Sequence, residues 1–489
     1  MYRAISHQQL ASPHRLAAPC AREAALRRRE VLLHFLLVAL FAAIYAATKS
    51  AITTLAAGGI SVFCIYLWLG MRESKRQHFW LTPLSFFFFW YCIGYGLSAI
   101  WAASYIHSEG ELPLLNQIVP GPDVASGYLL MLLGAASLHA GYVFVIEKIK
   151  IRQLEPSPAS PPSLVVWTLA FSLGIVALLW PQLFSFLGLA HMFFELLAPS
   201  VLLAFACLDR RNFQANRFQY ATCLFAGTLV LFLASVYNGS KLTAMLSLLP
   251  MLSAFVMRRR FRAVLPFGAA AVAVLYLGVI APMINESRNI AWTQSQLGRL
   301  GSALQEKTAL AGGDDHFYSD QLDSLFYRQF EPTAVGFIYS EVSTRGFLYG
   351  ETMKPLAYAF IPRIVWPQKP VVSLGTWFTA YLGFAGSPEE ATTNTGTYAA
   401  GEFYWNFGIV GVIAGMFLIG ACIATIYKGV GEGPHSSIIA AVFFYIAVIR
   451  IVELSSATEN IPEFIFVLLA LWGARFMAAV YGRGALRSA

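Results

Sequence analysis

The chain has 489 residues, of which 57% are hydrophobic and 15% aromatic, while only 12% are charged. Soluble domains carry about 25% charged residues, so this composition excludes an ordinary soluble enzyme. A mean hydropathy of +0.60 beside a net charge of +8 favours a membrane protein over a nucleic-acid-binding protein, and we expect no nucleic-acid partner.

The chain divides into four regions when it is read in order. Residues 1–30 are predicted to form a basic cytoplasmic tail, because they lack the apolar core of a cleavable signal peptide. Residues 31–281 and 407–489 contain apolar runs of the ~20 residues that a helix needs to cross a bilayer, and residues 282–406 separate these two regions. The sequence therefore predicts an all-α polytopic membrane protein with about twelve transmembrane helices. The expected spans are 31–48, 51–70, 80–102, 124–146, 164–180, 190–208, 218–236, 242–257, 263–281, 407–427, 437–454 and 461–481.

Lysine and arginine residues indicate the orientation of these spans. Most of the 34 basic residues lie before the first span or in every second connection, as in the run from Arg258 to Arg262. The alternate short connections hold only Lys49 and Lys241. The positive-inside rule therefore places both termini in the cytoplasm and residues 282–406 on the extracytoplasmic side, between the ninth and tenth helices.

The extracytoplasmic segment 282–406 is the first candidate for function. It is about 125 residues long, and loops of more than about 15 residues are rarely structureless, so we expect it to fold, with amphipathic helices at 294–310 and 320–342. Its basic residues lie on the side that the positive-inside rule disfavours, and they alternate with aromatic residues. Long translocated domains escape this rule, which explains any single one of these residues. As a group, they predict an anion-binding surface.

Cations beside aromatic rings suit a ligand that is anionic at one end and ring-shaped at the other. Guanidinium groups bind phosphate oxygens in pairs, and aromatic faces cover the C–H faces of sugars, so a lipid-linked sugar diphosphate fits both. Such a donor stores its own energy, so we expect no nucleotide cofactor, and the sequence has no P-loop. The adjacent acids Asp314 and Asp315, or Glu389 and Glu390, offer an alternative Mg²⁺ site. Both pairs lie in turn-like stretches, and we expect a metal-independent site.

A glycosyl transfer also needs a group that takes the proton of the acceptor hydroxyl. Glu402 is the leading candidate, because it follows Gly401 at the mouth of the tenth span, where partial desolvation would raise its pKa. The alternative for Glu402 is a boundary acid that pairs with a nearby arginine. The further candidates for the base are His316, Asp320, Asp323 and Glu331.

Four stretches of the sequence resemble one known family. They are IPRIVWPQKP at 361–370, Gly375, the Thr-, Asn- and Gly-rich stretch at 392–397, and GEFYWNFGIVG at 401–411. Together with about a dozen spans and one large late segment, they are similar to the Wzy-type oligosaccharide repeat-unit polymerases of bacterial O-antigen and exopolysaccharide pathways. The resemblance is strongest over roughly 280–430.

This resemblance implies a GT-C-like enzyme of the bacterial inner membrane with a periplasmic active site. Such an enzyme moves a growing glycan from undecaprenyl diphosphate onto an incoming lipid-linked repeat unit, without metal, and has a chain-length regulator and a flippase as partners. Some members carry a second arginine-containing outer loop. This chain departs from that pattern, because the outer connection at 103–123 contains neither Arg nor Lys.

The resemblance also implies roles for individual residues. Arg363 and Lys369 in the matching motif are expected to hold the diphosphate, and Arg363 is expected to act in catalysis with Glu402. The supporting diphosphate contacts are Arg288, Arg328 and Arg345. The residues expected to contact sugar are Trp366, Tyr398 and Tyr404.

Two other functions stay open at the level of sequence. An O-antigen ligase-like glycosyltransferase would use the same donor and a lipid A core acceptor. A lipid-linked oligosaccharide flippase or transporter would need a polar pathway through the spans, and few ionisable residues are expected inside them. The histidines within the spans, His34, His139 and His191, have no metal-ligand spacing, so helix packing is their expected role.

Overall fold

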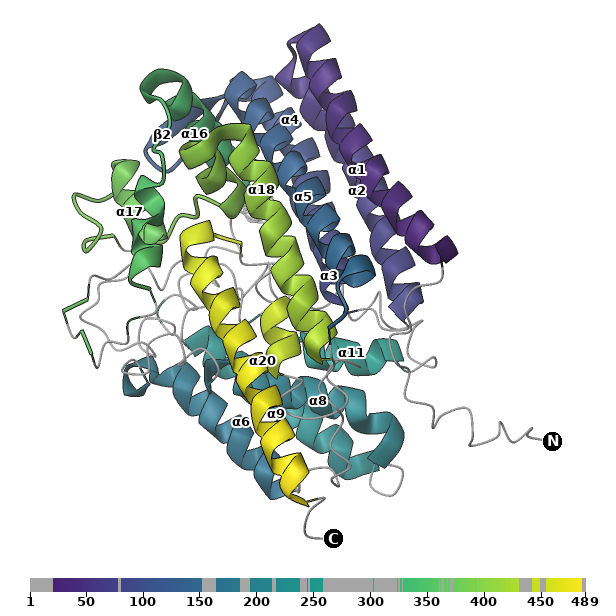
Figure 1. The fold of residues 1–489 in the computed structure, drawn as a ribbon. Helices are drawn as coiled ribbons and strands as arrows, with labels where there is room; N and C mark the ends of the chain where they lie inside the picture. Colours follow the sequence, from purple (N-terminus) through teal and green to yellow (C-terminus); the bar gives the residue numbers. More distant parts are fainter. Residues whose placement is uncertain are drawn as a thin grey trace.

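In the part of the chain that it describes, the computed structural model is mostly helical, with one small β-hairpin (Figure 1). It describes residues 21–77, 81–151, 164–184, 194–212, 217–237, 247–257, 329–359, 373–391, 393–430, 442–448 and 454–485, and the separate positions 244, 302, 323, 326–327, 361, 365–366 and 368–369.

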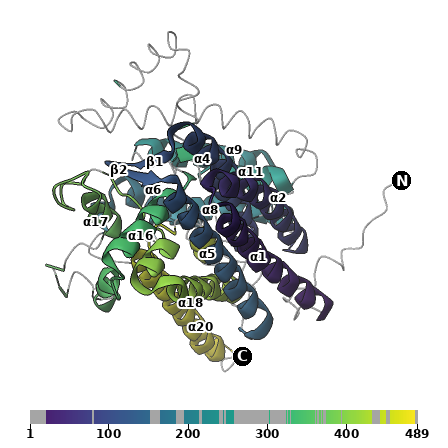
Figure 2. The same cartoon turned by 90° about the horizontal axis from the view of Figure 1, so that it is seen from above.

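The first helices form an antiparallel group at one side of the molecule (Figures 1 and 2). Helix α1 (Ala21–Thr48) lies beside α2 (Ala51–Gln77). The next span is made of three helical pieces in series: α3 (Pro83–Tyr91), the π-helix η2 (Cys92–Leu97) and α4 (Ser98–Glu109). Thr82 fixes the start of α3, because its side chain accepts a hydrogen bond from the backbone N–H of Ser85 while the Ser85 side chain accepts from that of Thr82.

A two-stranded hairpin connects α4 to α5. Strand β1 (Glu111–Leu114) pairs antiparallel with β2 (Gln117–Pro120) in the register Leu112 to Val119. Both of these side chains are buried, so the hairpin closes over the ends of the helices. Its turn also bonds to a later part of the chain, because the side chains of Asn116 and Gln117 donate to the carbonyl oxygens of Gly383 (2.8 Å) and Leu382 (3.0 Å).

Helix α5 (Gly121–Lys148) is the centre of the larger hydrophobic core. It packs most extensively against α18 (Ala399–Val430) and α16 (Pro332–Arg345). The backbones of α5 and α18 approach so closely that a Cβ atom at Gly141 would lie 1.9 Å from the carbonyl oxygen of Phe417. A Cβ at Gly420 would lie 2.0 Å from that of Leu138, so glycine is required at both positions. Gly408, with a φ of +65°, produces a kink in α18 after its first two turns.

Four further helices form a smaller core of their own. They are α6 (Leu164–Leu179), α8 (Leu197–Asn212), α9 (Arg217–Tyr237) and α11 (Leu249–Met257), packed around Trp167, Phe205 and Tyr220. Their other faces expose large apolar side chains such as Leu169 and Leu233, which suits contact with lipid. The remaining described elements are the short helices η3 (Pro181–Leu183), η7 (Glu351–Ala357) and α17 (Leu374–Tyr381), and α20 (Ala457–Ala485).

Six helices in the described part of the chain are long and apolar enough to cross a membrane, by length and composition. Together with the helical content, they give the chain the architecture of an all-α membrane protein. The predicted span 263–281 lies outside the described residues, as does most of 437–454. Of the predicted surface helix 294–310, only residue 302 is described. The six helices are Arg22–Thr48, Ala51–Arg76, Pro83–Glu109, Gly121–Lys148, Phe218–Tyr237 and Ala399–Val430.

Helices extend into two of the predicted non-spanning regions. Helix α1 begins at Ala21, within the predicted tail 1–30. Charged residues in its first turns are buried and paired, with Arg27 next to Glu73 (3.4 Å) and Glu30 next to Arg76 (2.7 Å), and a hydropathy window does not detect such pairs. The last residues of the predicted segment 282–406 form the first two turns of α18, before the kink.

Candidate functional site

A small pocket lies between the third span, α5 and the starts of α16 and α18. We call it the Glu331 pocket, after the one acidic side chain among its lining residues. Its interior volume is about 10 Å³, which is room for about one water molecule. Its lining is Phe87, Tyr91, Tyr95, Met131, Ala135, Glu331, Tyr398, Ala399, Ala400, Met416 and Leu454.

Glu331 occupies the position just before Pro332, the first residue of α16. The hydroxyl of Tyr95 donates a hydrogen bond of 3.0 Å to its Oε2 atom. Tyr95 belongs to the π-helix η2, and its ring lies 4.3 Å from that of Tyr91, one turn earlier. A π-helical turn inserts one extra residue and changes which side chains face inward, and such turns are frequent at functional sites.

The environment of the pocket changes the acidity of Glu331. Desolvation raises the pKa of its carboxyl group to about 8, against the opposing effect of the Tyr95 hydrogen bond. Burial also raises the pKa of the Tyr398 hydroxyl, which stays neutral. Glu331 can therefore hold or release a proton near neutral pH, while the tyrosine beside it acts as a neutral hydrogen-bonding group.

Glu402, the predicted base, is fully buried in the first turn of α18. Its Oε2 atom accepts hydrogen bonds from the backbone N–H groups of Ala457 (2.7 Å) and Thr458 (3.1 Å), the first two residues of α20. Its Oε1 atom accepts from the hydroxyls of Thr352 (3.1 Å) and Thr458. The carboxylate therefore caps the N-terminus of α20 from a distant helix, where unpaired N–H groups and the helix dipole favour a negative charge.

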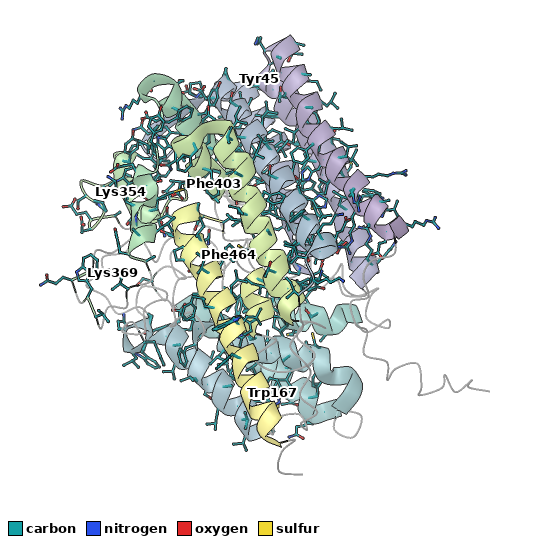
Figure 3. The ribbon with its side chains drawn as sticks, in the orientation of Figure 1. Tyr45, Trp167, Lys354, Lys369, Phe403 and Phe464 are labelled. Atoms are coloured by element: carbon teal, nitrogen blue, oxygen red, sulfur yellow. The ribbon has the colours of Figure 1, made fainter. Side chains whose placement is uncertain are left out.

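The structure describes two of the five predicted diphosphate-binding cations. Arg345, at the end of α16, is exposed, lies 3.2 Å from Glu341 and donates to the hydroxyl of Tyr381 (2.7 Å). Lys369 donates from Nζ to the carbonyl oxygens of Ala359 (2.7 Å) and Ile361 (3.1 Å), and thus holds its own loop together. Figure 3 shows Lys369 at the side of the molecule away from α1. Arg288, Arg328 and Arg363 lie outside the described residues.

The fourteen residues of α16 separate Arg345 from Glu331. At 1.5 Å per residue, the two ends of this helix are about 20 Å apart, so Arg345 cannot hold a diphosphate whose sugar is next to Glu331. Any cation that acts on such a diphosphate lies elsewhere in the chain.

The three residues predicted to contact sugar lie in three different environments. Tyr398 lines the Glu331 pocket, with a φ of +55°, and its backbone N–H donates to the carbonyl oxygen of Ser455 (2.7 Å). Tyr404 stacks on Tyr339 of α16, with ring centres 5.8 Å apart. Trp366 contacts the ring of Tyr358 at 5.8 Å and is partly exposed. Only Tyr398 is therefore next to a candidate base.

The acids proposed as an alternative metal site are placed only in part. Glu389 and Glu390 are exposed in a turn, and Asp314 and Asp315 lie outside the described residues. Within the described part of the chain, no three His, Cys, Asp or Glu residues are grouped so as to hold a metal ion. Of the further candidates for the base, Asp323 accepts a hydrogen bond of 2.8 Å from Nε1 of Trp101, and His316 and Asp320 are not described.

The sequence model of one protein family, described as "Domain of unknown function (DUF8712)", matches residues 79–432. The chain belongs to the DUF8712 family. No curated protein and no solved structure matches it. The part that DUF8712 covers runs from just before α3 to the end of α18, so it includes Glu331, Tyr95 and Glu402. The description of DUF8712 names no activity, and the resemblance to repeat-unit polymerases stays a prediction.

The sequence did not indicate the tyrosines that line the Glu331 pocket. Tyr91 and Tyr95 lie in an apolar span, more than two hundred positions before Glu331, and nothing in their spacing indicates a π-helix. The one available signal was Glu331 itself, an acid directly before a proline at the start of an amphipathic helix.

Proposed function

We propose that this member of DUF8712 is a bacterial membrane glycosyltransferase that extends a lipid-linked glycan, as repeat-unit polymerases do. The observation that carries the proposal is the Glu331 pocket, in which an enclosed carboxyl group with a pKa of about 8 lies among tyrosine side chains. The resemblance of 361–370 and 401–411 to the polymerase motifs supplies the substrate class. About twelve spans, a GT-C-like arrangement and cytoplasmic termini in the inner membrane belong to the same proposal.

In this mechanism Glu331 is the general base. The carboxylate takes the proton of the acceptor hydroxyl as the acceptor oxygen bonds to the anomeric carbon of the donor sugar. The bond between that carbon and the diphosphate oxygen breaks, and undecaprenyl diphosphate leaves with the electron pair. A base is most effective when its pKa is near the working pH, which suits a value of about 8.

Glu331 suits this role better than Glu402 on geometric grounds. Both oxygens of Glu402 already accept hydrogen bonds, four in all, from α20 and two threonines. A base must present a free lone pair to the substrate, and among the described residues Glu331 accepts a single side-chain hydrogen bond, from Tyr95 to one oxygen. The role of Glu402 as the base stays a prediction, and its contacts favour an anchoring role.

The departing diphosphate needs cations close to the pocket. Arg363, Arg288 and Arg328 are the predicted candidates, since Arg345 is too far from Glu331 and Lys369 is occupied with its own loop. Tyr398 is the proposed sugar contact beside Glu331, and Trp366 and Tyr404 are proposed contacts for more distant sugars.

Deletion of the protein in its native host, followed by complementation, tests this proposal. The deletion should cause single lipid-linked repeats to accumulate at the expense of long glycan, and Glu331→Gln should fail to restore long glycan at normal protein abundance. The matched control Glu389→Gln, at an exposed acid, should restore it. Long glycan from Glu331→Gln would exclude Glu331 as the base. Complete polymer that is not attached to lipid A core would instead identify a ligase.

A further inference from the structure

The end of the helix bundle opposite the β-hairpin contains a second group of buried polar residues. We call it the basic-end cluster. Arg27, Glu30 and Glu73 are each less than 5% exposed, although they lie on helices that could cross a membrane. Charged side chains at such positions are costly and usually functional. The cluster comprises Arg27, Glu30 and His34 of α1, Tyr66, Glu73 and Arg76 of α2, His139, Tyr142 and Glu147 of α5, and Tyr427 and Lys428 of α18.

Ion pairs satisfy one part of this cluster. Arg76 binds both oxygens of Glu30 at 2.7 Å, and Arg27 lies 3.4 Å from Glu73. Nζ of Lys428 donates to the last carbonyl oxygens of α5, including that of Ile149 (2.7 Å). Together with the ion pair between Arg28 and Glu147 (2.8 Å), these contacts tie α1, α2, α5 and α18 together, and they explain the charged residues nearest the helix ends.

Other polar atoms of the cluster have no partner among the described residues. They are Nε and Nη1 of Arg27, Nδ1 of His34, Nδ1 of His139, the hydroxyl of Tyr142 and Oε1 of Glu147. His139 and Tyr142 both lie close enough to Arg27 to interact with it electrostatically. Buried polar atoms without protein partners are the positions at which internal water binds. These atoms are therefore the positions in the cluster at which a water molecule would find hydrogen-bonding partners.

The histidines extend this polar group deep into the bundle. Nε2 of His34 lies 2.6 Å from the hydroxyl of Tyr66, and the rings of His34 and His139 are 5.8 Å apart. The sequence analysis assigned both histidines to helix packing, but each has an unpartnered ring nitrogen, which packing alone does not require. Imidazole accepts a proton at one nitrogen and releases it from the other, which makes it a suitable proton carrier.

One layer of aromatic rings separates these histidines from the Glu331 pocket. The ring of Phe88 lies 5.1 Å from that of His139, and Phe87 lies between Tyr66 (6.3 Å) and Tyr91 (4.8 Å). Phe87 also lines the pocket.

The same stripe of α5 passes from one polar region to the other. Met131 and Ala135 line the Glu331 pocket, and His139 and Tyr142 follow on the same face toward the cluster. From Met131 to Tyr142 the helix rises about 16 Å, about half of the ~30 Å hydrocarbon thickness of a bilayer.

We propose that the basic-end cluster and the Glu331 pocket are the two halves of a proton path through the helix bundle, with the Phe87–Phe88 layer as its narrowest point. Protons pass between the aqueous phase at the basic end and Glu331 by way of the water-binding atoms, His139, His34 and Tyr66. Each transfer breaks one O–H or N–H bond and forms another, so one proton moves and no group is oxidised or reduced. This path does not depend on the glycosyltransferase activity.

Proton flux into vesicles tests the path. The purified full chain is reconstituted in phosphatidylethanolamine–phosphatidylglycerol vesicles that contain a pH-sensitive dye, and a potassium gradient with valinomycin drives protons inward. Wild-type vesicles should acidify faster than protein-free vesicles. His139→Gln and Glu331→Gln should lower the flux about tenfold, because glutamine cannot carry a proton. His107→Gln, at an exposed histidine near the end of α4, is the matched control and should leave the flux unchanged.

A second variant distinguishes loss of the proton path from loss of the fold, because it is expected to raise the flux. Phe87→Leu keeps an apolar side chain but removes the ring at the narrowest point, so its flux should rise above wild type. A wild-type flux equal to that of protein-free vesicles would overturn the proposal, as would wild-type flux in folded His139→Gln. Unchanged flux in Phe87→Leu would exclude the aromatic layer as the barrier. Since no glycan substrate is present, these outcomes are independent of the proposed enzymatic function.

Discussion

Replacing Glu402 by alanine should strongly destabilise the protein, and the size of the effect follows from its contacts. The carboxylate accepts four hydrogen bonds in a site with no solvent exposure, two of them from the first N–H groups of α20. Alanine removes all four acceptor contacts and leaves buried donors on Ala457, Thr458 and Thr352 without their partner. An unsatisfied buried donor costs about 1–3 kcal/mol, so loss of the two backbone N–H contacts and the hydroxyl contacts should together cost about 3–5 kcal/mol.

Thermal unfolding in detergent, followed by size-exclusion chromatography with fluorescence detection, measures this effect. A loss of about 3–5 kcal/mol should lower the midpoint by several degrees. The control Glu389→Ala, at an exposed acid, should stay within about one degree of wild type, since surface substitutions change stability little. A midpoint for Glu402→Ala equal to that of the control would refute the capping role. If folded Glu402→Gln binds the lipid-linked repeat but transfers no glycan, the sequence-based assignment of Glu402 as the base gains support.

Four further predictions concern pH, Arg363, helix packing and metals. Because the pKa of Glu331 rises from 4.5 to about 8 on folding, the folded state binds a proton that the unfolded state has lost between these pH values. The free energy of unfolding of the wild type should therefore fall by a few kcal/mol as the pH rises from about 4.5 to 8. In parallel melting curves, Glu331→Gln should lack this pH-dependent fall. Arg363→Ala should abolish polymer while the protein stays inserted and abundant, and normal glycan lengths on a gel would remove Arg363 from the site. Gly420→Val should reduce the yield of folded protein severalfold, because its Cβ would meet the Leu138 carbonyl at 2.0 Å, and full yield by membrane immunoblot would contradict the close packing of α5 and α18. EDTA should leave glycan transfer by purified protein unchanged, and a strict requirement for added Mg²⁺ would reverse the metal-independent prediction.

The helical membrane architecture could be predicted from the sequence because its signal is local. An apolar run of about 20 residues must form its backbone hydrogen bonds within itself in a bilayer, so hydropathy alone predicted α2, α5 and α9. The full length of a helix has a weaker local signal. Arg27 and Glu30 interrupt the apolar pattern, and their partners on α2 explain why α1 extends back to Ala21, ahead of the predicted span 31–48.

The candidate site depended on contacts that no local pattern contains. The sequence predicted that Glu402 would be desolvated at the mouth of a span, and it is buried there, but its hydrogen-bond donors are Thr352 and residues at the start of α20, about fifty positions away on either side. Those donors favour an anchoring role over a catalytic one.

The converse holds for Glu331, which the sequence marked only as a further candidate. Its environment comes from Tyr95, 236 positions earlier, and from Tyr398. The sequence by itself determined which segments are helical, apolar or charged, because these properties depend on residues near one another in the chain. The tertiary structure alone decided which carboxyl groups accept many hydrogen bonds, which accept few, and which histidine rings lie close together. Desolvation and hydrogen bonding depend on groups that folding brings together from distant parts of the chain.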